Sequence, residues 1–135
     1  MVVETPQSQE LVDALAAQLA PAGYAWLDEV SDTAIDEMPP GTIAVVGEAT
    51  EVGAEFVTSV VTMTLDLMAI VPGGLREARV LRDALQRLVM DDRSLGGLAD
   101  ECSITASSLN PLDIEGSYVT VAVFVVVVRF IARGA

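Results

Sequence analysis

Acidic side chains are the residues of this chain that are most able to do chemistry, because the sequence contains no histidine and no lysine. They cluster at Asp91-Asp92 and at Asp100-Glu101, and magnesium and calcium prefer such oxygen ligands. No EF-hand spacing is present, and adjacent acids near helix ends are usually solvated. General acid–base catalysis needs a particular pair of carboxyl groups, and the sequence singles out none. We therefore expect no metal and no cofactor, with a weak divalent-cation site between subunits as the open alternative.

Other catalytic groups are missing. Without histidine there is no Ser-His-Asp or Cys-His nucleophile. The single cysteine, Cys102, cannot form an intramolecular disulfide, and its place at the start of an apolar stretch predicts a buried structural thiol. Gly73-Gly74 and Gly96-Gly97 match no phosphate-binding loop and are interpreted as a helix entry and a loop closure. We expect no catalytic residues and no enzymatic activity.

The charge of the chain bounds its partners. Twenty acidic residues against seven arginines give a net charge of −13 over 135 residues, which we expect to form a single domain, 1–135. Such a surface repels nucleic acid and gains nothing from an anionic membrane. The uninterrupted apolar run Val121–Val128 has eight residues, whereas a membrane-spanning helix needs about 20. We expect no membrane span.

The arginines are concentrated in one part of the sequence. Five of the seven fall within eighteen residues: Arg76, Arg79, Arg82, Arg87 and Arg93. Acidic residues dominate 28–55 instead, and opposite charges on separate parts of one chain allow head-to-tail docking of identical subunits. We name Arg76, Arg79 and Arg82 as candidate subunit-interface residues, although helical spacing places Arg82 nearer the apolar side. The alternative is a solvated helix face with local ion pairs of small benefit.

Two segments predict unusually long strands. Residues 55–71 alternate between apolar and threonine-rich positions, as expected of an antiparallel strand with one covered face. Residues 117–132 are rich in valine and aromatic side chains. As one strand they would span about 50 Å, whereas a compact domain of this length is about 37 Å across. A strand that outgrows its domain indicates assembly with a neighbour.

The other segments complete an α+β fold: a mainly antiparallel β-sheet with helices packed on one face. The clearest helix, 75–90, carries an apolar stripe. A first helix is expected from a cap at Thr5 or Ser8 to Pro21 and Gly23. The remaining expectations are short strands over 24–27 and 42–46, a loop over 28–37, a turn over 48–53, a strand over 102–108 and a turn or loop over 110–116.

From about Ile35 to Arg133 the chain resembles the tail terminator proteins of long-tailed, lambda-like phages. The order and spacing of several motifs carry the resemblance, together with a closing valine-rich strand. The motifs are Pro39-Pro40-Gly41-Thr42-Ile43-Ala44-Val45, then Glu48-Ala49-Thr50-Glu51, then Leu65-Asp66-Leu67-Met68-Ala69-Ile70-Val71-Pro72, then an arginine-bearing helix that runs into Val89-Met90-Asp91-Asp92 and Leu95-Gly96-Gly97-Leu98.

The resemblance implies a structural virion protein, made in the host cytoplasm, that forms a ring of usually six subunits at the head-proximal end of the tail. Such a ring stops growth of the tail tube and provides the head-joining surface. Its partners would be further copies of itself, the tail tube protein and a head–tail connector protein. Six copies of charge −13 carry about −78 in total, so DNA would pass through the channel of the ring without binding to it. The alternatives are a head–tail connector or stopper ring protein, and a small acidic protein-binding module.

Overall fold

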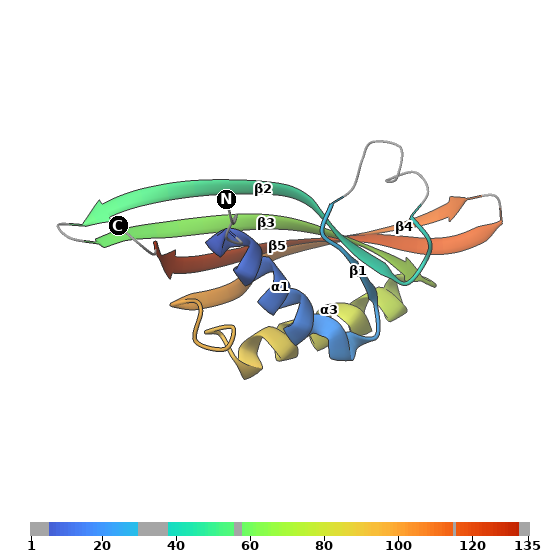
Figure 1. The fold of residues 1–135 in the computed structure, drawn as a ribbon. Helices are drawn as coiled ribbons and strands as arrows, with labels where there is room; N and C mark the ends of the chain where they lie inside the picture. The colour runs from blue at the N-terminus through green and yellow to red at the C-terminus, as the bar shows by residue number, and fades with distance from the viewer. Residues whose placement is uncertain (1–5, 30–37, 56–57, 115, 133–135) are drawn as a thin grey trace, which may run out of the picture.

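A computed structural model describes residues 6–29, 38–55, 58–114 and 116–132 of the chain. Two helices pack on the same side of one long, twisted sheet (Figure 1). The elements are α1 (Gln7–Leu19), the 3-10 turn η1 (Ala20–Ala22), β1 (Ala25–Leu27), β2 (Thr42–Glu55), β3 (Thr58–Pro72), α3 (Leu75–Asp91), β4 (Glu101–Ile114) and β5 (Ser117–Ile131). No helix in these ranges is long and apolar enough to cross a membrane.

The sheet confirms the predicted α+β fold. Its strand order is β1-β2-β3-β5-β4, in which β1 runs parallel to β2 and every other neighbouring pair is antiparallel. The two predicted long strands are β3 and β5, with 15 residues each, and β2 and β4 match them with 14 each. The β2–β3 and β4–β5 hairpins extend past the helices at opposite ends of the sheet (Figure 1).

Alternation along the two central strands decides which residues face the helices. In β3 the odd-numbered side chains from Val61 to Val71 are buried, and in β5 the even-numbered ones from Ala122 to Phe130 are buried. Successive side chains of a strand point to opposite faces. The register pairs Leu67 with Phe124, so both sets lie on the face that carries α1 and α3.

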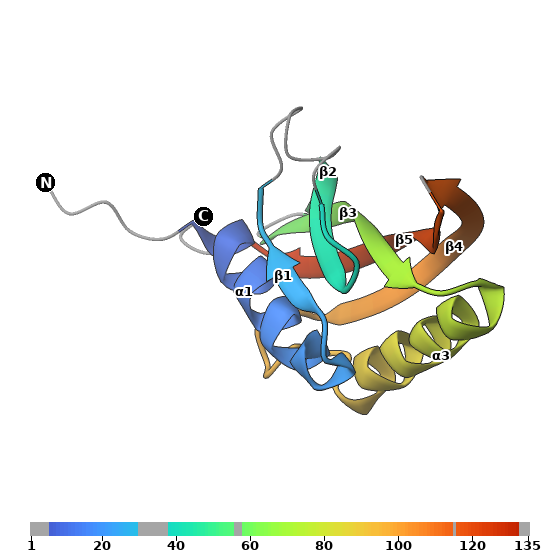
Figure 2. The same ribbon diagram turned by 90° about the vertical axis from the view of Figure 1, so that its right-hand side faces the viewer.

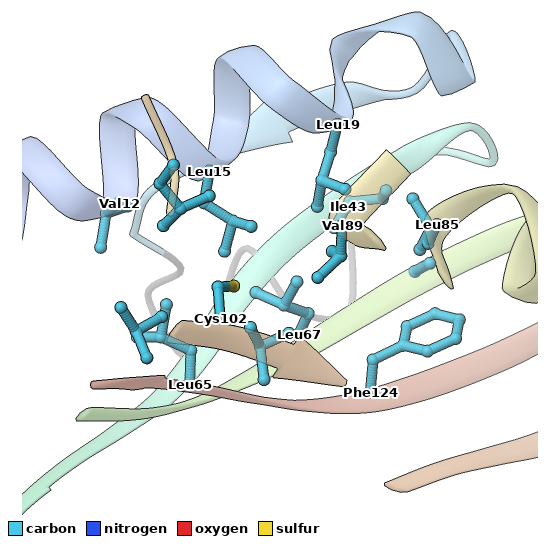
Figure 3. Packing of buried hydrophobic residues seen from close by; sticks show 14 of the residues in the cluster. Val12, Leu15, Leu19, Ile43, Leu65, Leu67, Leu85, Val89, Cys102 and Phe124 are labelled. Carbon is cyan, nitrogen blue, oxygen red and sulfur yellow. The ribbon is translucent and has the colours of Figure 1, made fainter. Parts of the chain in front are cut away.

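The core lies between this face and the helices. Leu65, Leu67 and Phe124 contribute from the sheet, while Leu15 of α1 and Leu85 of α3 pack onto them (Figure 3). All five side chains are fully buried. In the view turned by 90°, α1 and α3 lie next to each other on the same side of the sheet (Figure 2). The helices therefore form one layer and the sheet the other.

The ends of the helices differ in part from the predictions. Helix α3 begins at Leu75 as predicted and ends at Asp91. Helix α1 already begins at Gln7, with Pro6 preceding it, so Ser8 lies inside the helix and does not cap it. The other predicted cap, Thr5, and most of the predicted loop over 28–37 lie outside the described residues. At the far end Gly23 adopts a left-handed φ of 84° and stops the turn.

The predicted turn over 48–53 is wrong, because β2 continues from Thr42 to Glu55. Residues 48–53 of this strand are exposed, and they pair with β3 residue by residue, for example Glu48 with Leu65 and Thr50 with Met63. A register shift lies between Val45 and Gly47, and a Cβ on Gly47 would stand 2.9 Å from Asp66 Oδ2. Hydrogen bonding to β3 thus keeps a polar segment in a strand, which composition alone did not predict.

The predicted turn over 110–116 is also wrong for most of its length, because β4 extends to Ile114. Asn110 and Pro111 suggested a turn, but Pro111 lies opposite Thr120 in the β4–β5 pair. β4 is an edge strand, and proline is tolerated at an edge because its missing N–H leaves no central hydrogen bond unmade.

Candidate assembly surfaces

Two of the four carboxylates that were candidates for chemistry, Asp92 and Glu101, make local structural contacts. Asp92 follows α3, and its carboxylate accepts hydrogen bonds from the backbone N–H of Ser94 at 3.0 Å and of Gly96 at 2.9 Å. Bonds from the Ser94 hydroxyl and from these backbone groups hold the pKa of Asp92 below its usual range. Glu101 Oε1 lies 3.6 Å from Arg93 Nη1. Among the described residues, no group of three or more acidic or cysteine side chains could hold a metal ion.

Cys102 is a buried structural thiol, as predicted. It is fully buried in the core beneath α1 (Figure 3). Burial, and then the neighbouring Glu101 carboxylate, raise the pKa of the thiol to about 11. Because the thiolate is the nucleophile and the metal ligand, the raised pKa and the burial both disfavour the reactive form of this cysteine at neutral pH.

The two glycine pairs shape the chain, as predicted. Gly73 has a φ of 110°, and the N–H of Gly74 donates to Glu77 Oε2 at 2.9 Å. Hydrogen bonds from the N–H of Glu77 itself and from that of Gly74 lower the pKa of the Glu77 carboxyl. A Cβ on Gly74 would meet Tyr118 Cε1 at 2.7 Å. Gly96 and Gly97 have φ values of 74° and 87° in the loop after α3.

The outer face of α3 is exposed and carries most of its arginines. Because a helix turns about 100° per residue, six side chains share this face, and all of them are exposed. The outer face of α3 consists of Arg76, Arg79, Val80, Asp83, Arg87 and Met90. Val80 and Met90 remain 65% and 60% exposed. Three arginines and one aspartate make the face basic on an otherwise acidic protein.

Two of the three predicted interface arginines, Arg76 and Arg79, lie on this face, and Arg82 does not. The side chain of Arg82 is 36% exposed, and its Nε lies 3.4 Å from Asp83 Oδ1. Arg87 shares the outer face instead, about three turns after Arg76. Arg76, Arg79 and Arg87 form no ion pair with another described residue. The same helical arithmetic on the sequence would have found Arg87.

An acidic hollow lies on another part of the molecule, and its three carboxylates, Asp28, Glu29 and Glu48, all fall in the acidic segment 28–55 that the sequence analysis identified. It has a volume of about 490 Å³, and its lining comes from α1, from the residues after β1 and from the first half of β2. The lining residues are Gln9, Val12, Asp28, Glu29, Val45, Val46, Gly47 and Glu48. Three segments distant in the sequence thus form one concave surface, and two of them, after β1 and in β2, bring its three carboxylates.

Hydrogen bonds hold one of these carboxylates in place. Trp26 Nε1 donates to Asp28 Oδ1, and Gln9 Nε2 donates to Asp28 Oδ2 at 3.1 Å. Glu29 and Glu48 are exposed and form no ion pair with another described residue. Val46 adds an apolar side chain that is 38% exposed. The hollow therefore presents an anchored aspartate, two open glutamates and an apolar contact.

The third surface is the open face of the sheet, opposite the helices. The odd-numbered valines of β5 point to it: Val121, Val123, Val125 and Val127. Each is partly exposed, and both helices lie on the other side (Figure 1). Antiparallel sheets with one free face normally alternate apolar and polar residues. β5 instead is apolar on both faces, which is the pattern of a strand covered on both sides.

No protein-family model matches this chain, and no curated protein compared with it matches significantly. Among solved structures, the chain is similar in fold to a chain of the virion of a native gene transfer agent particle. The two share 13% sequence identity with a TM-score of 0.52, and the match covers 93% of this chain and 94% of the other. At this identity the likeness concerns the fold, and it extends over nearly the whole of both chains.

Proposed function

We propose that this protein is a non-enzymatic structural component of a phage-type virion that assembles into a closed ring. The observation that carries the proposal is the apolar open face of β5, which no described helix covers although a central strand of this composition is usually covered on both sides. The fold likeness to a chain of a virion particle supports it. Both features fit a subunit whose apolar sheet face becomes buried only when it associates with other subunits.

Within the virion, we assign the ring to the head-proximal end of the tail, where it would cap the tail tube and offer the head-joining surface. The assignment rests on the resemblance of residues 35–133 to tail terminators. Six subunits would make the ring, with the tail tube protein on one side and a head–tail connector protein on the other. The net charge of −13 per subunit suits a channel through which DNA passes without binding.

The basic outer face of α3 is the proposed subunit contact. Arg76 and Arg79 would make its ion pairs, and Arg82 would lie at its margin, where Asp83 already pairs with it. Charged pairs across an interface set its register and exclude wrong partners more than they add affinity. A basic face on an acidic subunit therefore suits the ordering of identical subunits in a ring.

Separated virion parts test the assignment. Heads and tails of the virus that encodes this chain are prepared separately and probed with an antibody against the protein. We expect the antibody to bind headless tails, at the end that would join the head. Recovery with tailless heads would instead identify a connector or stopper ring. Absence from both parts and from complete particles would contradict a structural role in the virion.

A further inference from the structure

We infer that the outer face of α3 of one subunit docks on the acidic hollow of the next copy of the same chain. The inference rests on the proposed ring and specifies its contact. The outer face of α3 is an unpartnered helix face: Val80 and Met90 are more than half exposed, and its arginines find no acidic partner among the described residues.

The hollow matches this face in charge. Its carboxylates come from Asp28, Glu29 and Glu48, whereas on the outer face of α3 the arginines outnumber the acidic residues. Glu29 and Glu48 are exposed and not engaged in a described ion pair. Guanidinium groups suit such a surface because their fork of donors matches carboxylate oxygens in pairs.

The two surfaces also match in apolar content. Val80 lies among the arginines of α3, and Val46 lies among the carboxylates of the hollow, where it is 38% exposed. Contact between them would remove both valines from water at the centre of a charged rim. Central apolar burial inside a polar rim is the usual anatomy of a protein interface.

One chain does not make this contact with itself. In the described chain Val80 and Met90 of α3 and Glu29 and Glu48 of the hollow are all exposed, and no arginine of α3 forms an ion pair with a carboxylate of the hollow. A contact between two different surfaces of identical subunits is heterologous, and it produces a ring when the rotation closes. The described surfaces thus supply both halves of a repeating contact.

A charge exchange tests the inference on the full-length protein. Arg76→Glu with Arg87→Glu makes the helix face acidic, and Glu29→Arg with Glu48→Arg makes the hollow basic. Each double variant alone would then repel its own copies, and we expect the concentration for half-assembly to rise about tenfold or more. In an equimolar mixture every helix face meets a hollow of opposite charge. We expect mixed assemblies with the two variants in a 1:1 ratio.

Asp100→Arg with Asp113→Arg is the matched control, because it changes net charge as much as the hollow variant at exposed positions outside both surfaces. Circular dichroism checks that all variants fold, and native mass spectrometry reads assembly. Normal assembly of each reversed variant alone, or no gain on mixing, would overturn the inference. If the wild-type chain forms rings and the reversed variants also assemble normally alone, or gain nothing on mixing, only this contact is wrong. If the wild-type chain and the mixture both stay monomeric, the ring fails as well.

Discussion

The two faces of β5 carry similar side chains in different surroundings. On one face Phe124 and Val126 lie beneath α1 and α3 and are fully buried. On the other, Val123 and Val125 are partly exposed, with neighbours only from the sheet itself, such as Met68 and Ser108. The first face explains how the subunit folds. The second is apolar without a described covering layer, so in the proposed ring folding and assembly would depend on opposite sides of one strand.

The largest expected effect on stability comes from truncating a large side chain on the helix-covered face. Phe124→Ala removes the largest fully buried side chain of β5, and such a truncation typically costs about 3–5 kcal/mol of the free energy of unfolding. Urea unfolding of the monomer measures it. Val123→Ala, the neighbour on the open face, is the control and should cost clearly less, because its side chain is not fully buried. Equal losses would show that the two faces do not differ.

The open face should respond in assembly more than in folding. Val123→Thr with Val125→Thr keeps the shape and the β-branching of both side chains, and it adds hydroxyl groups that water can satisfy in the monomer. We expect the free energy of unfolding to change by no more than about 1 kcal/mol, while assembly weakens. Sedimentation across a concentration series measures the association. The matched variant Val126→Thr, on the covered face, should reverse this pattern and destabilise the fold.

The arginines of α3 sharpen the comparison at a smaller scale. Arg76→Glu and Arg82→Glu change net charge equally, but only Arg76 lies on the outer face, while Arg82 pairs with Asp83 at 3.4 Å. We expect Arg76→Glu to reduce ring formation more than Arg82→Glu, with both proteins folded by circular dichroism. The reverse order would place the subunit contact on the other side of the helix.

The smallest effect concerns pH and the loop after α3. Hydrogen bonds from Ser94 and Gly96 lower the pKa of Asp92 in the folded protein. A group with a depressed folded pKa stabilises the fold above its unfolded pKa, and this contribution disappears as pH falls through the folded value. We therefore expect Asp92→Asn to destabilise the protein slightly at neutral pH and to have less effect at strongly acidic pH. Thermal unfolding across acidic pH measures the difference, which a pH-independent cost would contradict.

Sequence periodicity correctly predicted those elements whose conformation depends on their own residues alone. The stripe of α3 and the alternation of β3 gave their elements within a few residues, and the lone apolar cysteine was predicted correctly as buried. The predicted strands over 42–46 and 102–108 are shorter than β2 and β4, because Glu48 to Gly53 and Asn110-Pro111 have the composition of turns. Their strand conformation comes from pairing with β3 and β5, which no local pattern encodes.

The candidate surfaces divide in the same way. Arg76 and Arg79 share a face by helical spacing, which the sequence contains. The acidic hollow joins Gln9, Asp28 and Glu48, so it exists only after α1 has packed beside β1 and β2. The exposure of the valine run also depends on the sheet topology, because a central strand has a neighbouring strand on each side and an edge strand has only one.

Native mass of the concentrated wild-type protein tests the central claim most directly. Subunits of 14.2 kDa that cover their open faces and α3 helices by mutual contact should give a closed multiple of that mass, six by the proposal. The Val123→Thr, Val125→Thr variant should shift this species toward the monomer. A wild-type chain that remains strictly monomeric at high concentration, and is absent from virions, would contradict the account.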